Sequence, residues 1–456
     1  MNLHDTIVAL ATPQGMGAIG VIRLSGNDAI AIAAKVFHGK DLNQATSHTV
    51  HYGTIKDGEK VLDEVLVTVF RAPKSFTTED VIEIAGHGSP FVLREILGLL
   101  IRNGARAADA GEFTMRAFMH GRINLAQAEA VADMIASESE AQMRVALQQM
   151  RGGFSAQLQQ LREKLIHFAS LVELELDFSE EDVTFADRNA LQHLIADMQR
   201  QLKLLQQSFR QGNVIRNGVN TVIAGRPNAG KSTLLNALLQ DNRAIVSDIP
   251  GTTRDVIEET LIIGGISFRL MDTAGIREAT DAIEKIGVER TMMKIGESAV
   301  VLFIFDVAAM SLEAVQGDLE MLKREGSILI PVGNKTDLIG VTEARKKFHS
   351  LENLQLVAAR SEESVEELKQ HLLESIQMNA VDLNAPMVTN VRHFEALRTA
   401  SEALEAVLQG LEGGTTGDFL AADIRTALRA LGSITGEIDH DRDILGSIFG
   451  KFCIGK

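Results

Sequence analysis

Two periods of hydrophobic residues alternate along the chain and divide it into segments. Residues 1–118 hold short apolar runs, such as VLVTVF at 65–70, between helical stretches such as FVLREILGLLI at 91–101. Glycine and proline separate these runs, as they do at turns between strands and helices. We therefore predict an N-terminal α+β domain over residues 1–118.

From residue 119 the apolar positions alternate in steps of three and four, the spacing of a helical bundle seam. This spacing fills residues 119–215 and returns in residues 380–456. The first segment has the seams Phe154, Leu158, Leu161, Leu165, Phe168 and Val172, then Leu191, Leu194, Met198, Leu202, Leu205 and Phe209. The second has Phe394, Leu397, Leu404, Leu408 and Leu411, then Leu420, Ile424, Leu428 and Leu431. We predict one helical domain built from both segments.

Residues 216–379, between these segments, show a third pattern. Four short apolar runs are separated by helical stretches: TVIAG at 221–225, SFRLMD at 267–272, AVVLFIFD at 299–306 and SILIPVGNK at 327–335. Such runs are typical of a parallel sheet covered by helices. The predicted fold class is therefore multidomain α/β and α, with an α/β domain inserted into a discontinuous helical domain. Insertion is feasible because the termini of a domain tend to lie close together.

Composition narrows the cellular setting. The 456 residues include one cysteine, 45 basic and 61 acidic residues, for a formal net charge of −16. A single cysteine excludes an intrachain disulfide framework, which fits a reducing compartment. The first residues lack a signal-peptide pattern, and no apolar run reaches the roughly 18 residues of a membrane span. We expect a cytoplasmic protein with no membrane partner.

The acidic balance argues against broad, charge-driven binding of nucleic acid. An RNA partner would have to meet a local basic patch or another subunit. The arginine and histidine residues of FRQGNVIRNG at 209–218 and VRHFEALR at 391–398 are candidates for such a patch. Charged helix faces are far more often simply solvated, so both interpretations stay open here.

The stretch GRPNAGKS at 225–232 follows the apolar run TVIAG and precedes the helical run TLLNALL. A strand, a glycine-rich loop and a helix in that order form a phosphate-binding loop, whose N–H groups and helix N-terminus stabilise phosphate charge. Lys231 would reach the β and γ phosphates, and the Ser232 hydroxyl would ligate Mg²⁺. Taken alone, the stretch could also be a glycine-rich turn.

Three further motifs decide between these interpretations. MDTAG places Asp272 at the end of an apolar run, where it can hold Mg²⁺ through water, and the Gly275 N–H can contact the γ-phosphate. Thr253, in GTTRD, is placed to close over Mg²⁺. Asp337, in NKTD, can accept hydrogen bonds from guanine's N1–H and 2-amino group. Adenine lacks both donors, so a buried Asp337 would reject it. The four motifs predict a P-loop, Ras-like G domain that binds GTP.

The residue after DTAG differs from that of Ras-like switches, which use a glutamine there to orient the attacking water. Here it is Ile276, which has no hydrogen-bonding group. The attacking water must therefore be positioned by another residue.

Together with the flanking helical segments and the terminal FCIGK, these motifs resemble the MnmE (TrmE) family of tRNA-modifying GTPases. The resemblance covers essentially the whole chain. It includes ATPQGMGAIGVIRLSG at 11–26, FTTEDVIEIAGHG at 76–88, GEFTMRAF at 111–118 and NLAQAEAVADMI at 124–135. It implies that the N-terminal domain binds folate and mediates a homodimer.

The activity that the resemblance implies is GTP hydrolysis stimulated by potassium and by dimerisation of the G domains. With the flavoprotein MnmG, in a heterotetramer, the protein would install a carboxymethylaminomethyl group at C5 of the wobble uridine in certain tRNAs. The one-carbon unit would come from 5,10-methylene- or 5-formyl-tetrahydrofolate. The expected ligands are therefore GTP, Mg²⁺, K⁺ and folate.

The resemblance also assigns roles around the nucleotide. Glu284 matches an acidic residue that acts through water and would replace the missing glutamine, beside Lys231 and Thr253 as the other catalytic residues. A K⁺ ion between phosphates can stabilise transition-state charge as an arginine finger does. The expected metal ligands are Ser232 and Thr253 for Mg²⁺, and Asn228, Ser247, Ile249 and Thr252 for K⁺. The expected nucleotide contacts are Asn228, Ala229, Gly230, Lys231, Ser232, Thr233, Ser247, Asp248, Ile249, Pro250, Gly251, Thr252, Thr253, Asp272, Thr273, Ala274, Gly275, Asn334, Lys335, Thr336, Asp337, Ala358, Ala359 and Arg360.

The folate site that the resemblance implies includes Arg23, Glu83 and the terminal Lys456. Arg122 stands where the family pattern has lysine, so the charge is kept and the geometry differs. A carboxylate suits the donor edge of a pterin, and a cation suits the glutamate tail. Without the resemblance, Arg23 and Glu83 would be ordinary surface charges. Cys453 is either a thiolate nucleophile or a small buried apolar residue.

One further departure from the family pattern and two rival functions stay open. The guanine-binding motif usually written SA plus a basic residue is Ala358-Ala359-Arg360 here, which lacks the hydroxyl. A ribosome-assembly GTPase without group-transfer chemistry predicts a basic RNA-binding appendage, which the sequence lacks. A regulatory GTPase whose partner performs all the chemistry is the third alternative.

Overall fold

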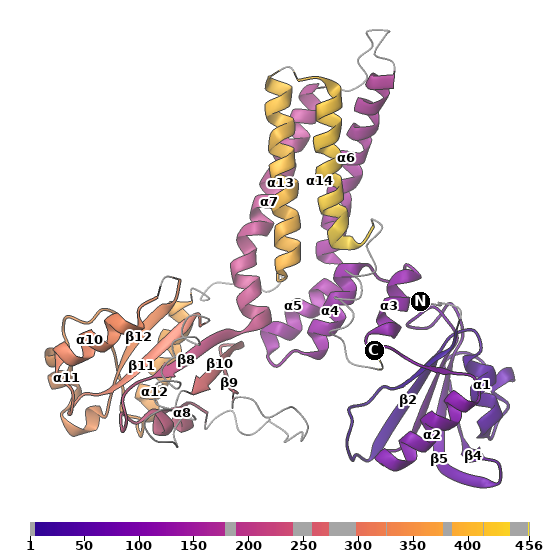
Figure 1. Ribbon diagram of the computed structural model, residues 1–456, viewed down its shortest axis with the longest axis horizontal. Coiled ribbons are helices and arrows are strands. Elements are labelled where there is room, and N and C mark those ends of the chain that lie inside the picture. The colour runs from indigo at the N-terminus through magenta and orange to yellow at the C-terminus, as the bar shows by residue number, and fades with distance from the viewer. Residues whose placement is uncertain are drawn as a thin grey trace, which may run out of the picture. The chain divides into compact units, whose positions relative to one another are not determined.

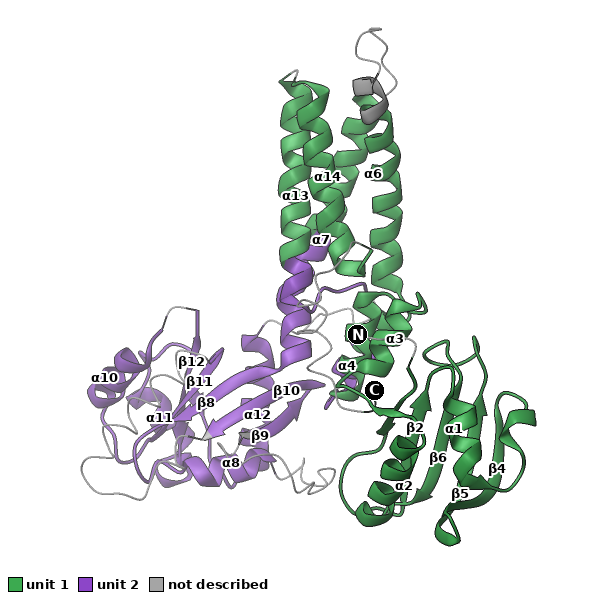
Figure 2. Cartoon of the chain, turned by 45° about the vertical axis from the view of Figure 1, so that its right-hand side comes forward, with its two compact units in different colours: residues 1–136, 146–203, 395–456 green, residues 137–145, 204–394 purple. Residues whose placement is uncertain are grey.

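The computed structural model describes residues 5–177, 188–239, 258–272, 298–324, 326–376, 385–413, 415–437 and 455 (Figure 1). The chain forms two compact units, which Figure 2 colours separately. Unit 1 comprises Met1–Ala136, Ala146–Lys203 and Glu395–Lys456, and unit 2 comprises Ser137–Val145 and Leu204–Phe394. The domain borders at 118, 215 and 379 remain predictions.

The N-terminal part of unit 1 is a seven-stranded sheet in the order β3-β4-β5-β6-β2-β1-β7. Neighbouring strands are antiparallel except β1 and β7, which are parallel. The strands are β1 (Ile7–Leu10), β2 (Ile19–Ser25), β3 (Phe37–His38), β4 (Thr49–Asp57), β5 (Lys60–Phe70), β6 (Val81–His87) and β7 (Arg106–Ala107). Helices α1 (Ala29–Val36) and α2 (Pro90–Arg102) cover one face (Figure 1).

The core of this part lies between that face and the two helices. Leu93, Ile96 and Leu100 of α2 recur at steps of three and four, and all three are buried in one cluster with Ile22 and Val67 from the strands. Apolar residues at helical spacing on α2 therefore pack against apolar residues that alternate along the strands, as expected for an α+β layer.

Unit 1 also contains most of the helical bundle (Figure 2). Its helices, some of which continue into unit 2, are α3 (Glu112–Met119), α4 (Leu125–Ile135), α5 (Glu140–Met150), α6 (Gly153–Asp177), α7 (Arg188–Asn217), α13 (Val391–Glu412) and α14 (Gly417–Thr435). α6 packs on α14, and the predicted seam residues Leu158, Leu165 and Ile424 are all buried. None of the helices in the described ranges is both long and apolar enough to span a membrane.

Four predicted seam positions are wrong by one residue: Phe168, Leu194, Leu408 and Leu428 are half-buried, whereas the adjacent Ala169, Ile195, Val407 and Ala427 are buried. In α7, Ile195 is fully buried, whereas the predicted Leu194 is only half-buried. Leu191, Ile195 and Met198 continue the alternating steps of four and three, so the buried stripe stays on one face of the helix. The apolar pattern could not distinguish Leu194 from Ile195, because both residues are apolar.

Unit 2 is built on a six-stranded sheet in the order β13-β12-β11-β8-β10-β9, parallel except for the pair β9 and β10. The strands are β8 (Val219–Ala224), β9 (Glu258–Ile263), β10 (Ile266–Asp272), β11 (Val300–Asp306), β12 (Ile328–Asn334) and β13 (Gln355–Leu356). The helices of this part are α8 (Lys231–Leu239), α10 (Leu312–Leu322), α11 (Val341–Lys347) and α12 (Glu362–Ser375).

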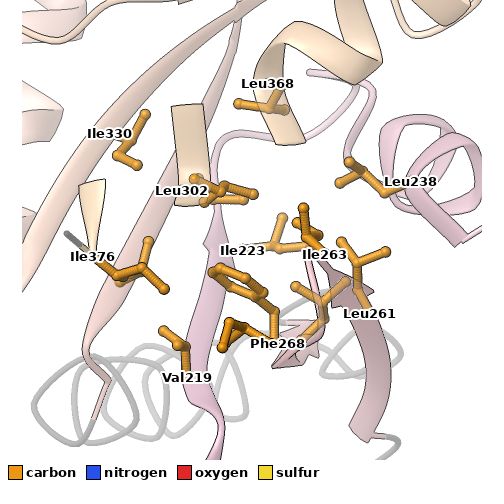
Figure 3. Close-up of a cluster of buried hydrophobic side chains, with 14 of the residues drawn as sticks. Val219, Ile223, Leu238, Leu261, Ile263, Phe268, Leu302, Ile330, Leu368 and Ile376 are labelled. Atoms are coloured by element: carbon orange, nitrogen blue, oxygen red, sulfur yellow. The ribbon is translucent and has the colours of Figure 1, made fainter. Parts of the chain in front are cut away.

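Two buried clusters lie in this sheet's layers. Figure 3 shows the first, in which Phe268 and Ile223 pack with Leu302 and with Leu368 of α12. The second includes Phe305 and further apolar residues. From β8 the strands are added on both sides, β10 on one side and β11 on the other, so the strand order reverses at β8. In open parallel sheets, ligands bind at the carboxyl ends of the strands beside such a reversal. The loop that follows β8 and the NKTD residues that end and follow β12 lie at this edge.

Candidate functional site

The loop between β8 and α8 turns through backbone conformations that few side chains tolerate. Gly225, Asn228 and Gly230 have φ angles of +148°, +62° and +89°. A Cβ on Gly225 would lie 2.1 Å from the Ile304 carbonyl oxygen, and one on Gly230 would lie 2.3 Å from Nδ2 of Asn334. Glycine is therefore required at both positions. The loop is held closely against the ends of β11 and β12.

Lys231, the first residue of α8, holds this loop from within. Its side chain is only 7% exposed, and its ammonium donates to the carbonyl oxygens of Gly225 at 2.6 Å and Arg226 at 3.0 Å. Ser232 and Thr233 follow in the first turn and are exposed. The positive end of α8, an ammonium group and a hydroxyl thus lie together at the loop.

Asn334 joins the base-reading motif to the phosphate-binding loop. It is buried, and its Nδ2 donates to the Ala229 carbonyl oxygen at 2.9 Å. Lys335 follows in the left-handed region, with φ +65°, and its ammonium donates to Asp306 at 2.7 Å. Burial raises the pKa of Asp306, but the hydrogen bonds from Lys335 and from the Ala308 and Ala309 amides outweigh it, so this pKa lies below its ordinary value.

Asp337 and Ala358 line one cavity of about 900 Å³. The Ala358 segment is shaped by Ser364, whose hydroxyl bonds both the N–H and the carbonyl oxygen of Ala358, at 3.2 and 3.0 Å. Asp337 is exposed, not buried as the adenine argument assumed. Since the carboxylate sits at the rim of a cavity, rejection of adenine requires that a bound base cover it.

Other predicted residues of the nucleotide site are only partly described. Ala359 is half-buried and Arg360 exposed beside Ala358, and Thr336 is buried. Asp272 ends β10, where its backbone pairs with Ile223 of β8. The remaining predicted residues lie outside the described ranges: Ser247, Asp248, Ile249, Pro250, Gly251, Thr252, Thr253, Thr273, Ala274, Gly275, Glu284, Cys453 and Lys456.

Two residues of the predicted folate site meet on the N-terminal sheet. Arg23 of β2 and Glu83 of β6 are direct cross-strand partners, with Nε donating to Oε1 at 2.9 Å. Their side chains are 25% and 28% exposed. Nη1 of Arg23 also donates to the Gly455 carbonyl oxygen at 3.4 Å, and the Phe113 ring centre lies 5.7 Å from its guanidinium carbon. Arg23 thus contacts a residue that lies 432 positions away in the sequence.

Arg122, the third predicted folate residue, contacts a different loop. Its guanidinium donates to the Ser75 carbonyl oxygen, and the nearby His120 ring bonds the Thr77 carbonyl oxygen at 2.7 Å. No bond joins Arg122 to Arg23 or Glu83 among the interactions of the described residues. The contacts of Arg122 are therefore separate from those of the Arg23–Glu83 pair.

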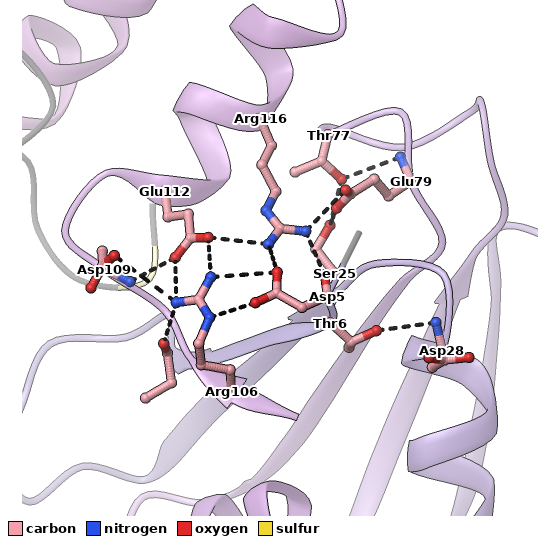
Figure 4. Close-up of polar contacts among 11 residues, drawn as sticks. Asp5, Thr6, Ser25, Asp28, Thr77, Glu79, Arg106, Asp109, Glu112 and Arg116 are labelled. Atoms are coloured by element: carbon pink, nitrogen blue, oxygen red, sulfur yellow. Dashed lines mark hydrogen bonds and ion pairs between the residues drawn. The ribbon is translucent and has the colours of Figure 1, made fainter. Parts of the chain in front are cut away.

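A buried ionic network, drawn in Figure 4, underlies this region. Arg116 is fully buried and donates to Asp5 at 2.6 Å, Glu79 at 3.0 Å and Glu112 at 3.1 Å. Arg106 also donates to Asp5, at 2.6 Å, and to Glu112, at 2.5 Å. These contacts join α3 to β7 and to the chain segments that precede β1 and β6.

Comparison with known proteins identifies the family. A family model described as the MnmE helical domain matches residues 125–453, and one described as the GTP-binding protein TrmE N-terminus matches residues 6–122. The tRNA modification GTPase MnmE of Cytophaga hutchinsonii is 56% identical over 455 residues, covering 100% of this chain and 98% of its own length. The chain belongs to the MnmE family of tRNA modification GTPases. It is a GTP hydrolase that acts in tRNA modification.

Further relatives agree with membership of the MnmE family. The MnmE of Christiangramia forsetii is 49% identical, with 100% of both chains covered. A crystal structure of Era from Aquifex aeolicus is 26% identical over 41% of this chain and 66% of its own, with a TM-score of 0.28. Because that score is low, the assignment rests on the full-length MnmE relatives.

Sequence reasoning missed three groups of this MnmE chain. Arg226, inside the phosphate-binding loop, makes a two-pronged pair with Asp318 of α10 at 2.7 and 2.9 Å. Asp306 and the buried Arg116 were also overlooked. A charged residue ending an apolar strand, as Asp306 does, was the available signal. Arg226 and Arg116 gave none, because their partners are 92 and up to 111 residues away in sequence.

Proposed function

We propose that this chain is a K⁺-stimulated GTPase that works with the flavoprotein MnmG and a tetrahydrofolate one-carbon unit. Together they add a carboxymethylaminomethyl group to C5 of the wobble uridine of tRNA. The observation that carries the group-transfer part is the contact of the Arg23–Glu83 pair with the Gly455 carbonyl oxygen. It joins the N-terminal sheet to the terminal FCIGK segment. A GTPase acting only as a switch does not require that contact.

The phosphate-binding loop supports the GTPase part of the proposal. The Lys231 ammonium and the N-terminus of α8 supply positive charge where phosphates would bind. Asn228 and Ser232 are exposed oxygen donors at this place, which suits hard cations. Ser232 with Thr253 would hold Mg²⁺, and Asn228 with the 247–252 loop would hold K⁺. Bound there, the two cations supply positive charge beside the phosphate oxygens.

The Arg23–Glu83 pair fits the folate part of the proposal. Both side chains are partly exposed, so neither is sealed from a ligand. Glu83 would accept hydrogen bonds from the donor edge of a pterin, and Arg122 and Lys456 would bind the carboxylates of the glutamate tail. Tetrahydrofolate supplies the one-carbon unit when bound. Arg23, held by Glu83 and the Gly455 carbonyl, would position the terminal segment beside it.

The open face of the N-terminal sheet supports a homodimer. Val50, Tyr52 and Leu66 are 58%, 66% and 48% exposed, and Tyr52 and Leu66 are direct cross-strand partners. Large apolar side chains clustered on an exposed face mark protein interfaces. The opposite face is already covered by α1 and α2, so the dimer would form through the open one.

Nucleoside analysis of tRNA tests the proposed function. Cells lacking this protein should lose the C5-modified wobble uridine, and the wild-type gene should restore it. A gene carrying Arg23→Ala should not restore it. Arg102→Ala should, because within the described ranges Arg102 makes an exposed ion pair with Asp57 and no other. Unchanged tRNA nucleosides in cells without the protein would contradict the proposal and favour a GTPase without group-transfer chemistry.

A further inference from the structure

Two arginine-containing segments without carboxylates come together in unit 2. They are residues 204–218, which include the end of α7, and residues 385–394, which include the start of α13. They contain Arg210, Arg216 and Arg392 and no aspartate or glutamate, in a chain with 61 acidic residues. The sequence alone could not show that these segments, almost 200 positions apart, form one surface.

Three contacts join the two segments. The rings of Phe209 and Phe394 are stacked, with centroids 4.5 Å apart and an interplanar angle of 22°. The Val388 N–H donates to the Ser208 hydroxyl at 3.1 Å. A Cβ on Gly212 would lie 2.2 Å from the Val388 carbonyl oxygen, so the backbones touch at a position that only glycine allows. The two segments are therefore packed directly against each other.

The outer face of α7 at this junction is polar and cationic. Gln207, Arg210 and Asn217 are exposed and lie on one side of the helix, while Leu205 and Ile215 are buried on the other. Arg210 has no carboxylate partner within the described parts of the chain. A guanidinium between exposed amides, with no carboxylate on it from the described ranges, gives a local positive potential on an acidic protein.

The first turn of α13 adds a second guanidinium and an aromatic ring. Nη2 of Arg392 lies 3.0 Å from Nε2 of His393. Phe209 and Phe394 are half-buried, so part of the stacked pair reaches the surface. The next carboxylate in sequence, Glu395, is already paired with Arg398 at 2.6 Å. We call Gln207, Phe209, Arg210, Arg392 and Phe394 together the arginine surface.

We propose that this arginine surface contacts the tRNA substrate, with Arg210 bonding a backbone phosphate. Arginine and amide side chains beside an accessible aromatic pair are the combination that proteins use to hold phosphates and unstacked bases of RNA. An acidic protein partner would pair with Arg210 but would not call for the exposed amides and rings. The inference rests on the proposed function, because it takes tRNA as the substrate.

Binding of a tRNA transcript to the full chain tests the arginine surface. The probe is an unmodified transcript with uridine at the wobble position, titrated at several salt concentrations. Arg210→Glu should weaken binding on the order of fivefold and lower the salt slope by about one contact. Arg210→Lys should bind like the wild type. Lys346→Glu, a like charge reversal at an exposed residue of α11, should also bind like the wild type.

Three results would overturn the inference. The first is wild-type binding by Arg210→Glu, and the second is an equal loss with Lys346→Glu, since charge anywhere on the protein would then suffice. The third is failure of the wild-type chain to bind the transcript at all. Modification of tRNA in cells separates that third case: if it persists, only the arginine surface is wrong, and if it is absent, the proposed function fails as well. Thermal melting of each variant controls for folding.

Discussion

At the scale of single residues, Asp337 is the predicted reader of the guanine base. Its carboxylate lies at the rim of the cavity that Ala358 also lines. Asp337→Asn replaces one acceptor by an amide donor, which matches the carbonyl that xanthine has in place of guanine's 2-amino group. Competition binding should show preference moving from GTP toward xanthosine triphosphate. If the variant discriminates as the wild type does, Asp337 does not read the base.

Gly455 is the other residue whose geometry carries a prediction. It has φ +97°, and a Cβ there would lie 2.2 Å from the Leu10 carbonyl oxygen. Gly455→Ala should displace the terminal segment from Arg23, so tRNA modification should fall at least tenfold while GTP hydrolysis in K⁺ continues. Gly58→Ala is the matched control, because its φ is +60° but nothing lies within 4 Å of its Cβ. Equal modification by both variants would show that the Gly455 contact is dispensable.

At the scale of elements, the buried ionic network ties α3 to β7 and to the start of β1. Hydrogen bonds from Arg106 and Arg116 lower the pKa of Asp5 despite its partial burial. Burial raises the pKa of Glu112, but bonds from Arg106, the Asp109 amide and Arg116 outweigh it and bring this pKa below 4.5. A depressed carboxyl pKa stabilises the fold fully above its unfolded value and loses that effect as the pH falls through the folded one.

The N-terminal part should therefore lose stability below about pH 4.5, the ordinary value for Glu112. Hydrogen exchange of β1 and β6 in the full chain, measured between pH 3 and 6, would follow it. Glu112→Gln should lower protection at pH 6 and flatten its dependence on pH, because the neutral amide cannot titrate. Arg102→Leu, which removes only an exposed pair, should change neither. An unaltered pH profile in Glu112→Gln would refute the assignment.

At the scale of the whole molecule, the proposed function places GTP hydrolysis and group transfer in different parts of the chain. The proposal expects hydrolysis to be fast in K⁺ and slow in Na⁺, because ligands spaced for K⁺ hold the smaller ion poorly. Glu284→Ala should lower turnover and leave GTP affinity nearly unchanged, since a water-positioning residue acts mainly in the transition state. Equal rates in both salts at matched ionic strength would contradict the potassium assignment, and a large loss of affinity would make Glu284 structural.

Much of the fold could be predicted from local sequence. The apolar runs ending in Asp306 and Asn334 became β11 and β12, and the helical steps of α6 became its buried stripe. Leu194 shows the limit of such patterns, because neighbouring apolar residues compete for one buried position. Burial of Asp337, assumed from chemistry, is not seen, because the side chain is exposed and burial depends on what covers a residue.

The sequence by itself determined the nucleotide motifs, the helical and strand segments and the family, because these depend on residues close together along the chain. Only the tertiary structure decided which distant groups meet. Arg23 finds Glu83 through strand register, Arg116 gathers three carboxylates at a helix face, and Phe209 stacks on Phe394 across almost 200 positions. The physical reason is that these contacts follow from how sheets and helices pack, and no local pattern of residues encodes such a pairing.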